Sequence, residues 1–76
     1  MKRIVFTQHA SEMIVLRQLN KKFVEECIRN PDEIMPAKEN KHSYVKNMGK
    51  NYLKVIIAEE KQTFIVITTY WFAKVR

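Results

Sequence analysis

Tyrosine and lysine side chains recur at alternating positions in the second half of the sequence, where the pattern predicts β-strands. The residues that could contact nucleic acid are His42, Tyr44, Lys46, Lys50, Tyr52 and Lys54. An aromatic ring can stack on an unpaired base while an ammonium group neutralises a phosphate, so these residue types on one sheet surface predict binding of single-stranded RNA. The structural alternative is that exposed strands favour Tyr and Lys for packing alone.

Metal-free cleavage of RNA is the reaction that the titratable residues could support. It needs a base for the 2′-hydroxyl, an acid for the leaving oxygen and cations for the pentavalent phosphate. The candidate catalytic residues are His9, Arg17, Lys46 and Tyr70, with His9 as the candidate for proton transfer. His9 and Arg17 are about 12 Å apart along an α-helix, so they could border one site. Their spacing alone favours simpler roles, as a polar residue at a helix start and a surface ion-pair partner.

The elements that position these residues follow from capping residues and periodicity. A β-branched and aromatic run predicts a strand at Arg3–Phe6, and Thr7 is the expected N-cap of a helix that continues to about Leu19. Asn20 is the expected N-cap of a second helix. The apolar stripe of that helix is Phe23, Val24, Cys27 and Ile28. Residues 31–40 predict a turn with a short extended piece at 33–35.

Three further strands are predicted at residues 42–46, 52–58 and 63–71, joined by the short turns 47–50 and 59–62. The order β-α-α-β-β-β predicts an α+β fold in which two N-terminal helices pack on one face of an antiparallel sheet. The strand residues expected to face the helices are Val45, Leu53, Val55, Ile57, Ile65 and Ile67. The opposite face is expected to carry His42, Tyr44, Lys46, Tyr52, Lys54, Thr68 and Tyr70.

Composition limits the class of protein. The 76 residues, 46% hydrophobic and 29% charged, predict one domain spanning 1–76 and exclude large cofactor-binding folds. A formal net charge of +6, with four lysines and no acidic residue between positions 40 and 58, indicates a polyanionic partner. One cysteine and two histidines predict no disulfide, metal or cofactor and a reducing cytoplasm. Apolar runs of about four residues predict no membrane span.

A family resemblance rests on several short segments. These are Phe6-Thr7-Gln8-His9-Ala10, Arg17, Asn30-Pro31-Asp32-Glu33-Ile34, Tyr44-Val45-Lys46, Tyr52-Leu53-Lys54-Val55 and Val66-Ile67-Thr68-Thr69-Tyr70. They resemble small bacterial and archaeal domains with the opening pattern T-x-HA-x-x-R-M-x-x-R-G-I followed by N-P-D. The layout is similar to RelE/ParE-like toxins and more distantly to BrnT ribonuclease toxins. Met13 stands where the pattern has its first arginine, and Gln18-Leu19 where it has Gly-Ile.

The resemblance implies a toxin of a type II toxin-antitoxin system that cleaves free or ribosome-bound mRNA without a metal. Its implied partners are RNA and an acidic antitoxin protein, with a second copy of the chain as a further candidate. The alternative is a non-catalytic domain of the same fold that binds nucleic acid or protein, which the missing arginine at Met13 favours. A third hypothesis is a module that binds a protein partner through Trp71 and Phe72. ParE-like members act on gyrase, so the fold alone leaves the activity open.

Overall fold

The computed structural model describes residues 3–73. Within that range the chain forms an α+β fold in the predicted order, with one more strand than expected. Its elements are β1 (Arg3–Phe6), α1 (Gln8–Leu16), α2 (Lys21–Arg29), β2 (Glu33–Pro36), β3 (Lys41–Asn47), β4 (Asn51–Glu60) and β5 (Thr63–Ala73). The short piece predicted at 33–35 is β2, a full member of the sheet. No helix in the described residues is long and apolar enough to cross a bilayer.

The five strands form one mixed sheet in the order β1-β5-β4-β3-β2. β2 to β5 pair as antiparallel neighbours, as predicted. β1 instead pairs parallel to β5, so the prediction of a wholly antiparallel sheet is wrong. Because β1 takes the edge beside β5, the helix that follows it begins at that edge.

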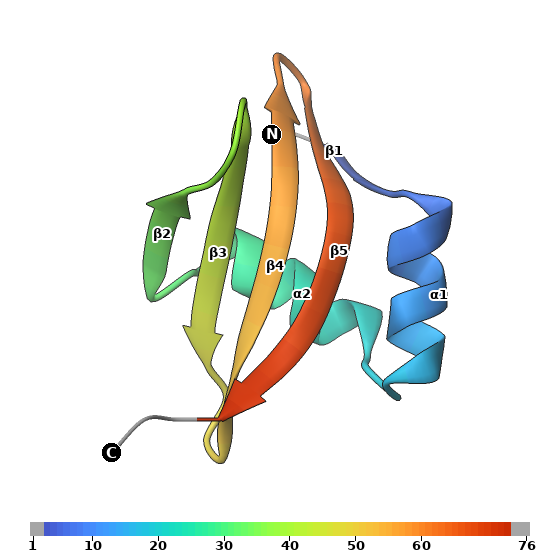
Figure 1. Cartoon of the computed structure of the whole chain (residues 1–76), viewed down its shortest axis with the longest axis vertical. Coiled ribbons are helices and arrows are strands. Elements are labelled where there is room, and N and C mark those ends of the chain that lie inside the picture. The colour runs from blue at the N-terminus through green and yellow to red at the C-terminus, as the bar shows by residue number, and fades with distance from the viewer. Residues whose placement is uncertain (1–2, 74–76) are drawn as a thin grey trace.

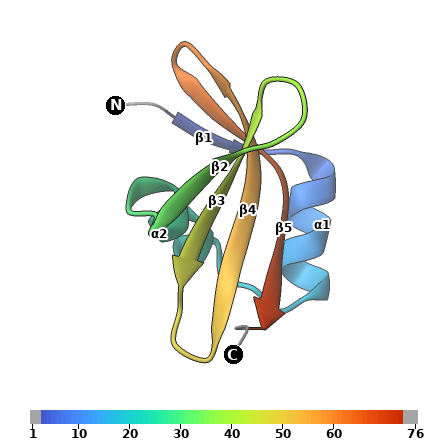
Figure 2. The same cartoon turned by 60° about the vertical axis from the view of Figure 1, so that its left-hand side comes forward.

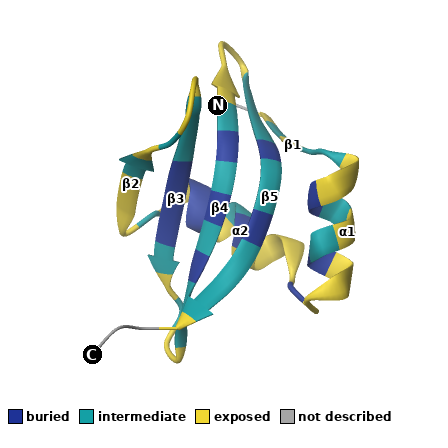
Figure 3. Cartoon of the chain, in the orientation of Figure 1, coloured by how far each residue is buried: buried dark blue, intermediate teal, exposed yellow. Residues whose placement is uncertain are grey.

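The two helices occupy different places around the sheet. Figures 1 and 2 show α2 covering one face, while α1 lies beside β5 at the sheet edge. The prediction that both helices cover one face therefore holds for α2 only. α1 still contributes Ala10 and Ile14 to the same core that α2 packs on (Figure 3). The buried residues of this core are Ala10, Ile14, Leu19, Val24, Cys27, Ile28, Tyr44, Leu53, Val55, Ile57 and Val66.

Both predicted N-caps are confirmed. The Thr7 hydroxyl oxygen accepts a hydrogen bond from the Ala10 N–H at 3.0 Å and donates to the Val66 carbonyl at 2.9 Å, which ties the start of α1 to β5. The Asn20 side-chain oxygen accepts from the Lys22 N–H at 2.8 Å.

The end of α1 comes earlier than predicted. The helix stops at Leu16, and Gln18 takes a left-handed conformation with φ of 55°. The Leu19 N–H then donates to the Ile14 carbonyl at 2.8 Å and the Gln18 N–H to the Val15 carbonyl at 3.2 Å, which is a Schellman motif. This turn directs Leu19 into the core, where only 9% of it is exposed.

Replacing Gln18 with glycine is expected to stabilise the protein by about 0.5–1 kcal/mol, because glycine adopts a left-handed conformation without the steric cost of a Cβ atom. Urea unfolding followed by circular dichroism measures this change. Gln62→Gly, in the β4–β5 turn, is the matched control and is expected to be neutral or destabilising. Equal destabilisation by both substitutions would contradict the argument.

The strand register assigns each sheet residue to a face, because cross-strand partners lie on the same side. The β4 residues that face α2 are Leu53, Val55 and Ile57, as predicted, and all are 0% exposed. Their β3 partners are Lys46, Tyr44 and His42. Val45, predicted to face the helices, pairs with Lys54 on the opposite face. The β3 residues that face α2 are therefore the alternate set to the one predicted.

In β5 a bulge changes the alternation. Ile57 pairs with Val66 but its neighbour Ile56 pairs with Thr68, so Ile67 is an extra residue between them. Before the bulge Val66 faces the core, and Ile65, predicted to do so, lies on the opposite face. After the bulge the buried residue is Thr69, whose hydroxyl donates to the Lys54 carbonyl at 3.1 Å. The bulge leaves Thr68 and Tyr70 on the side away from α2, as predicted.

Candidate functional site

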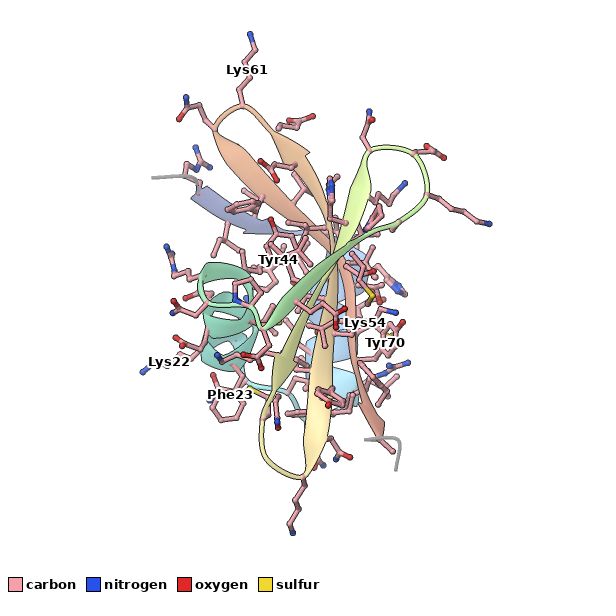
Figure 4. All side chains as sticks on the ribbon, turned by 90° about the vertical axis from the view of Figure 1, so that its left-hand side faces the viewer. Lys22, Phe23, Tyr44, Lys54, Lys61 and Tyr70 are labelled. Carbon is pink, nitrogen blue, oxygen red and sulfur yellow. The ribbon has the colours of Figure 1, made fainter. Side chains whose placement is uncertain are left out.

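On the sheet face opposite α2, no helix of residues 3–73 covers β3, β4 or the lower part of β5 (Figure 1), and this side is called the open face. Its β4 and β5 positions alternate with the buried Leu53, Val55 and Thr69. Figure 4 shows Lys54 and Tyr70 projecting on this side, and Tyr44 and Phe23 on the side of α2. The open face is therefore where β4 and β5 present polar and aromatic side chains.

Three aromatic rings and two cations are in contact on this face, and together they are called the aromatic-cation cluster. Its members are Arg17, Tyr52, Lys54, Tyr70 and Phe72. Lys54 pairs with Tyr70 and Tyr52 with Phe72 in the β4–β5 ladder. The Lys54 ammonium lies 5.9 Å from the centre of the Tyr70 ring and 5.8 Å from that of Phe72. Tyr52 stacks on Phe72 with 5.2 Å between ring centres and 26° between planes.

The second cation comes from the end of α1. The Arg17 guanidinium carbon lies 5.7 Å from the centre of the Tyr70 ring. This contact forms because α1 runs beside β5 (Figure 1) and ends at its C-cap residue, Arg17, whose guanidinium reaches the Tyr70 ring. Each cation-π contact contributes about 0.5–1 kcal/mol at an exposed site. The cluster thus combines predicted residues from three separate elements: Arg17, Lys54 and Tyr70.

His9 does not join the cluster. It lies exposed in the first turn of α1, eight residues and about 12 Å along the helix from Arg17. Lys50 is exposed in the β3–β4 turn, one residue before β4, and borders the cluster at the end of the sheet where Tyr52 and Phe72 lie. Among the described residues, the predicted proton-transfer group is therefore separated from the predicted phosphate contacts.

Tyr44 is a core residue, so its prediction as an exposed stacking residue is wrong. It is 7% exposed, faces α2, and makes an edge-on contact with Phe64 at 6.0 Å between ring centres. Burial raises the pKa of the Tyr44 hydroxyl, and the nearby Glu59 carboxylate, which accepts its hydrogen bond, raises that pKa further. These contacts fix Tyr44 under α2, away from any ligand on the open face.

Lys46 and His42 share the face of Tyr44, so their predicted place on the open face is also wrong. The Lys46 ammonium donates to the Asn30 carbonyl at 2.9 Å, at the C-terminal end of α2, where a cation is favoured by the helix dipole. The His42 Nδ1 atom is buried and makes no hydrogen bond in the described structure. Both residues lie across the sheet from the aromatic-cation cluster.

The lysines between positions 40 and 58 consequently do not form one surface. Lys41 lies at the start of β3 with Glu39 3.9 Å away, Lys46 contacts α2, Lys50 is in a turn and Lys54 lies on the open face. The cationic stretch of the sequence is therefore distributed over several sides of the sheet. On the open face, the second cation of the cluster is supplied by α1.

Cys27 has no chemical role that the structure supports. Its thiol is buried and donates to the Tyr44 carbonyl at 3.3 Å, and desolvation raises its pKa to about 12 despite the opposing effect of Lys46. Among residues 3–73, no three His, Cys, Asp or Glu side chains gather closely enough to hold a metal ion.

The third hypothesis above treats Trp71 and Phe72 as one partner-binding surface. The structure separates the two residues. Trp71 pairs with Leu53 and packs against the core, whereas Phe72 joins the open face beside Tyr52. Their alternation along β5 is the signal that distinguishes them.

The chain belongs to the family described as a domain of unknown function, DUF4258, which it matches over residues 6–71. That range includes four of the five cluster residues and ends one residue before Phe72. No curated protein and no solved structure matches the chain.

Proposed function

We propose that this protein binds single-stranded RNA on the open face, through the aromatic-cation cluster. The observation that supports this function best is the contact of Tyr70 with two cations, one from the sheet and one from α1. Aromatic rings offer stacking surfaces to any base, and cations beside them neutralise the connecting phosphates. A protein partner is the alternative ligand class, because Tyr, Phe and Arg are also enriched at protein interfaces. Lys54, at the centre of the cluster, is of a residue type depleted there and favours RNA.

The sequence resemblance keeps a toxin-like role within this proposal. It implies RNA as the ligand and an acidic antitoxin as the protein partner. Arg17 and Lys54 both contact the Tyr70 ring, so each is suitably placed to hold a phosphate next to a base stacked there. Cleavage would also need proton transfer, and His9 lies eight residues before Arg17, about 12 Å away along α1. Binding without turnover is thus the better supported form of the function.

The Tyr70→Leu variant is expected to bind a fluorescein-labelled, unstructured RNA 12-mer at least fivefold more weakly than wild type, because one stacked base contributes about 1–3 kcal/mol. Fluorescence anisotropy at 50 mM salt measures the affinity. Gel analysis of the same samples reports cleavage, and intact RNA is the expected result.

Phe23→Leu is the matched control, because Phe23 is 45% exposed on α2, across the sheet from the cluster (Figure 4). It is expected to leave the affinity unchanged. An affinity that is unchanged in Tyr70→Leu, or no binding by wild type, would contradict the proposal. RNA fragments made by wild type and lost in His9→Ala would restore the cleavage hypothesis.

A further inference from the structure

We infer that the open face selects an unstacked, pyrimidine-rich strand and holds two successive nucleotides, with Lys54 on the phosphate between them. This inference rests on the proposed RNA-binding function and specifies its ligand. It depends on how far apart the rings of the aromatic-cation cluster are held and on where the two cations lie between them.

The spacing of the rings is set by the strand. Tyr70 and Phe72 are two residues apart on the same face of β5, which places their backbone positions about 6.7 Å apart. Stacked bases in a nucleic acid strand are separated by about 3.4 Å. Two neighbouring bases therefore cannot remain stacked on each other while each uses one of these rings.

Other contacts hold the rings at this spacing. Phe72 is stacked on Tyr52, which fixes it in a two-ring unit, and Tyr70 lies between β4 and the end of α1, where Arg17 reaches it. Both β5 residues have direct partners in the β4 ladder, so neither can shift along the sheet without breaking backbone hydrogen bonds. The ligand must adapt to the rings.

Lys54 marks the place of the phosphate. Its ammonium is almost equally distant from the two rings, 5.9 Å from Tyr70 and 5.8 Å from Phe72. A strand with one base on each ring has its connecting phosphate between them, where this ammonium lies. Arg17, on the Tyr70 side, is then suited to the next phosphate along the strand.

Base preference follows from the cost of unstacking. A strand whose bases stack weakly, such as oligouridylate, opens at lower cost than oligoadenylate, and preferences for pyrimidine runs arise in this way at stacking surfaces. A protein with one ring imposes no such cost, because a single base can stack on it while its neighbours remain stacked together. The preference therefore depends on having two separated rings.

The test compares hexauridylate with hexaadenylate by fluorescence anisotropy, using wild type, the double variant Tyr52→Leu Phe72→Leu and the control Phe23→Leu. Wild type and the control are expected to bind hexauridylate about three- to tenfold more tightly than hexaadenylate. The double variant Tyr52→Leu Phe72→Leu, which keeps Tyr70 as the one ring of the cluster together with both cations, is expected to lose this preference. In competition, the dinucleotide UpU is expected to displace labelled hexauridylate at a concentration at which uridine monophosphate does not.

The outcomes separate the two proposals. If neither oligonucleotide binds wild type, RNA binding itself is refuted. If both bind but hexaadenylate binds as tightly as hexauridylate, or if the preference persists in Tyr52→Leu Phe72→Leu, the two-nucleotide site is refuted while RNA binding stands. If uridine monophosphate displaced labelled hexauridylate as effectively as UpU does, the assignment of Lys54 to a connecting phosphate would also be refuted.

Discussion

Replacing Leu53 with alanine is expected to lower the free energy of unfolding by about 3 kcal/mol. Leu53 is 0% exposed and lies on β4, the central strand of the sheet, on the face that α2 covers. Truncation removes buried methyl groups and leaves a cavity between the sheet and the helix. A domain of this size has only roughly 5–10 kcal/mol of stability in total, so this loss is a large part of it.

Urea unfolding followed by circular dichroism measures this effect, and Val15→Ala is the control. Val15 is 78% exposed on α1, so its truncation is expected to change stability by less than about 0.5 kcal/mol. A loss at Leu53 as small as that at Val15 would show that the core is not centred there. Because Leu53 separates Tyr52 from Lys54 in β4, its burial also directs those two side chains to the open face.

The helix caps and most strands of this fold could be predicted from local chemistry. Thr7 and Asn20 precede apolar stripes at helical spacing, and both cap as expected. Gly49, the only glycine of the sequence, marks the β3–β4 turn with φ of 105°. These features depend on neighbours in the chain, which is why sequence alone identifies them.

The face of β3 was mispredicted because the length of the turn before β4 was mispredicted. The predicted strands end at 46 and begin again at 52, which leaves five residues between them and pairs Val45 with Leu53. The observed turn between the paired Asn47 and Tyr52 has four residues, so Tyr44 instead lies on the face of Leu53. A buried Tyr44 with a hydrogen bond to Glu59 therefore fills the core position.

Two features of the site required the tertiary structure. The bulge at Ile67 falls within an uninterrupted apolar run, Phe64 to Ile67, so no residue type marks it. The contact between Arg17 and Tyr70 depends on α1 lying beside β5, which follows from the parallel pairing of β1 with β5. Neither the pairing nor the helix position is encoded in a local pattern.

RNA binding by the Arg17→Met Lys54→Met double variant is expected to be about 60-fold weaker than wild type at 50 mM salt. Each phosphate contact to a single strand contributes about −0.7 to the slope of log affinity against log salt. Arg17, Lys54 and the bordering Lys50 predict a wild-type slope of about −2, and the variant keeps about −0.7 from Lys50. Taking the two proteins as equal at 1 M salt, this difference gives the 60-fold loss at 50 mM.

The variant must be compared with a second double variant, Lys22→Met Lys61→Met, because both lose two positive charges from the chain. Lys22 lies exposed on α2 and Lys61 in the β4–β5 turn, both away from the cluster (Figure 4). If binding depended only on net charge, the two variants would lose affinity and slope equally, and the open face would have no special role. A slope near −2 that persists in the control and falls in the cluster variant would assign the phosphate contacts to Arg17 and Lys54.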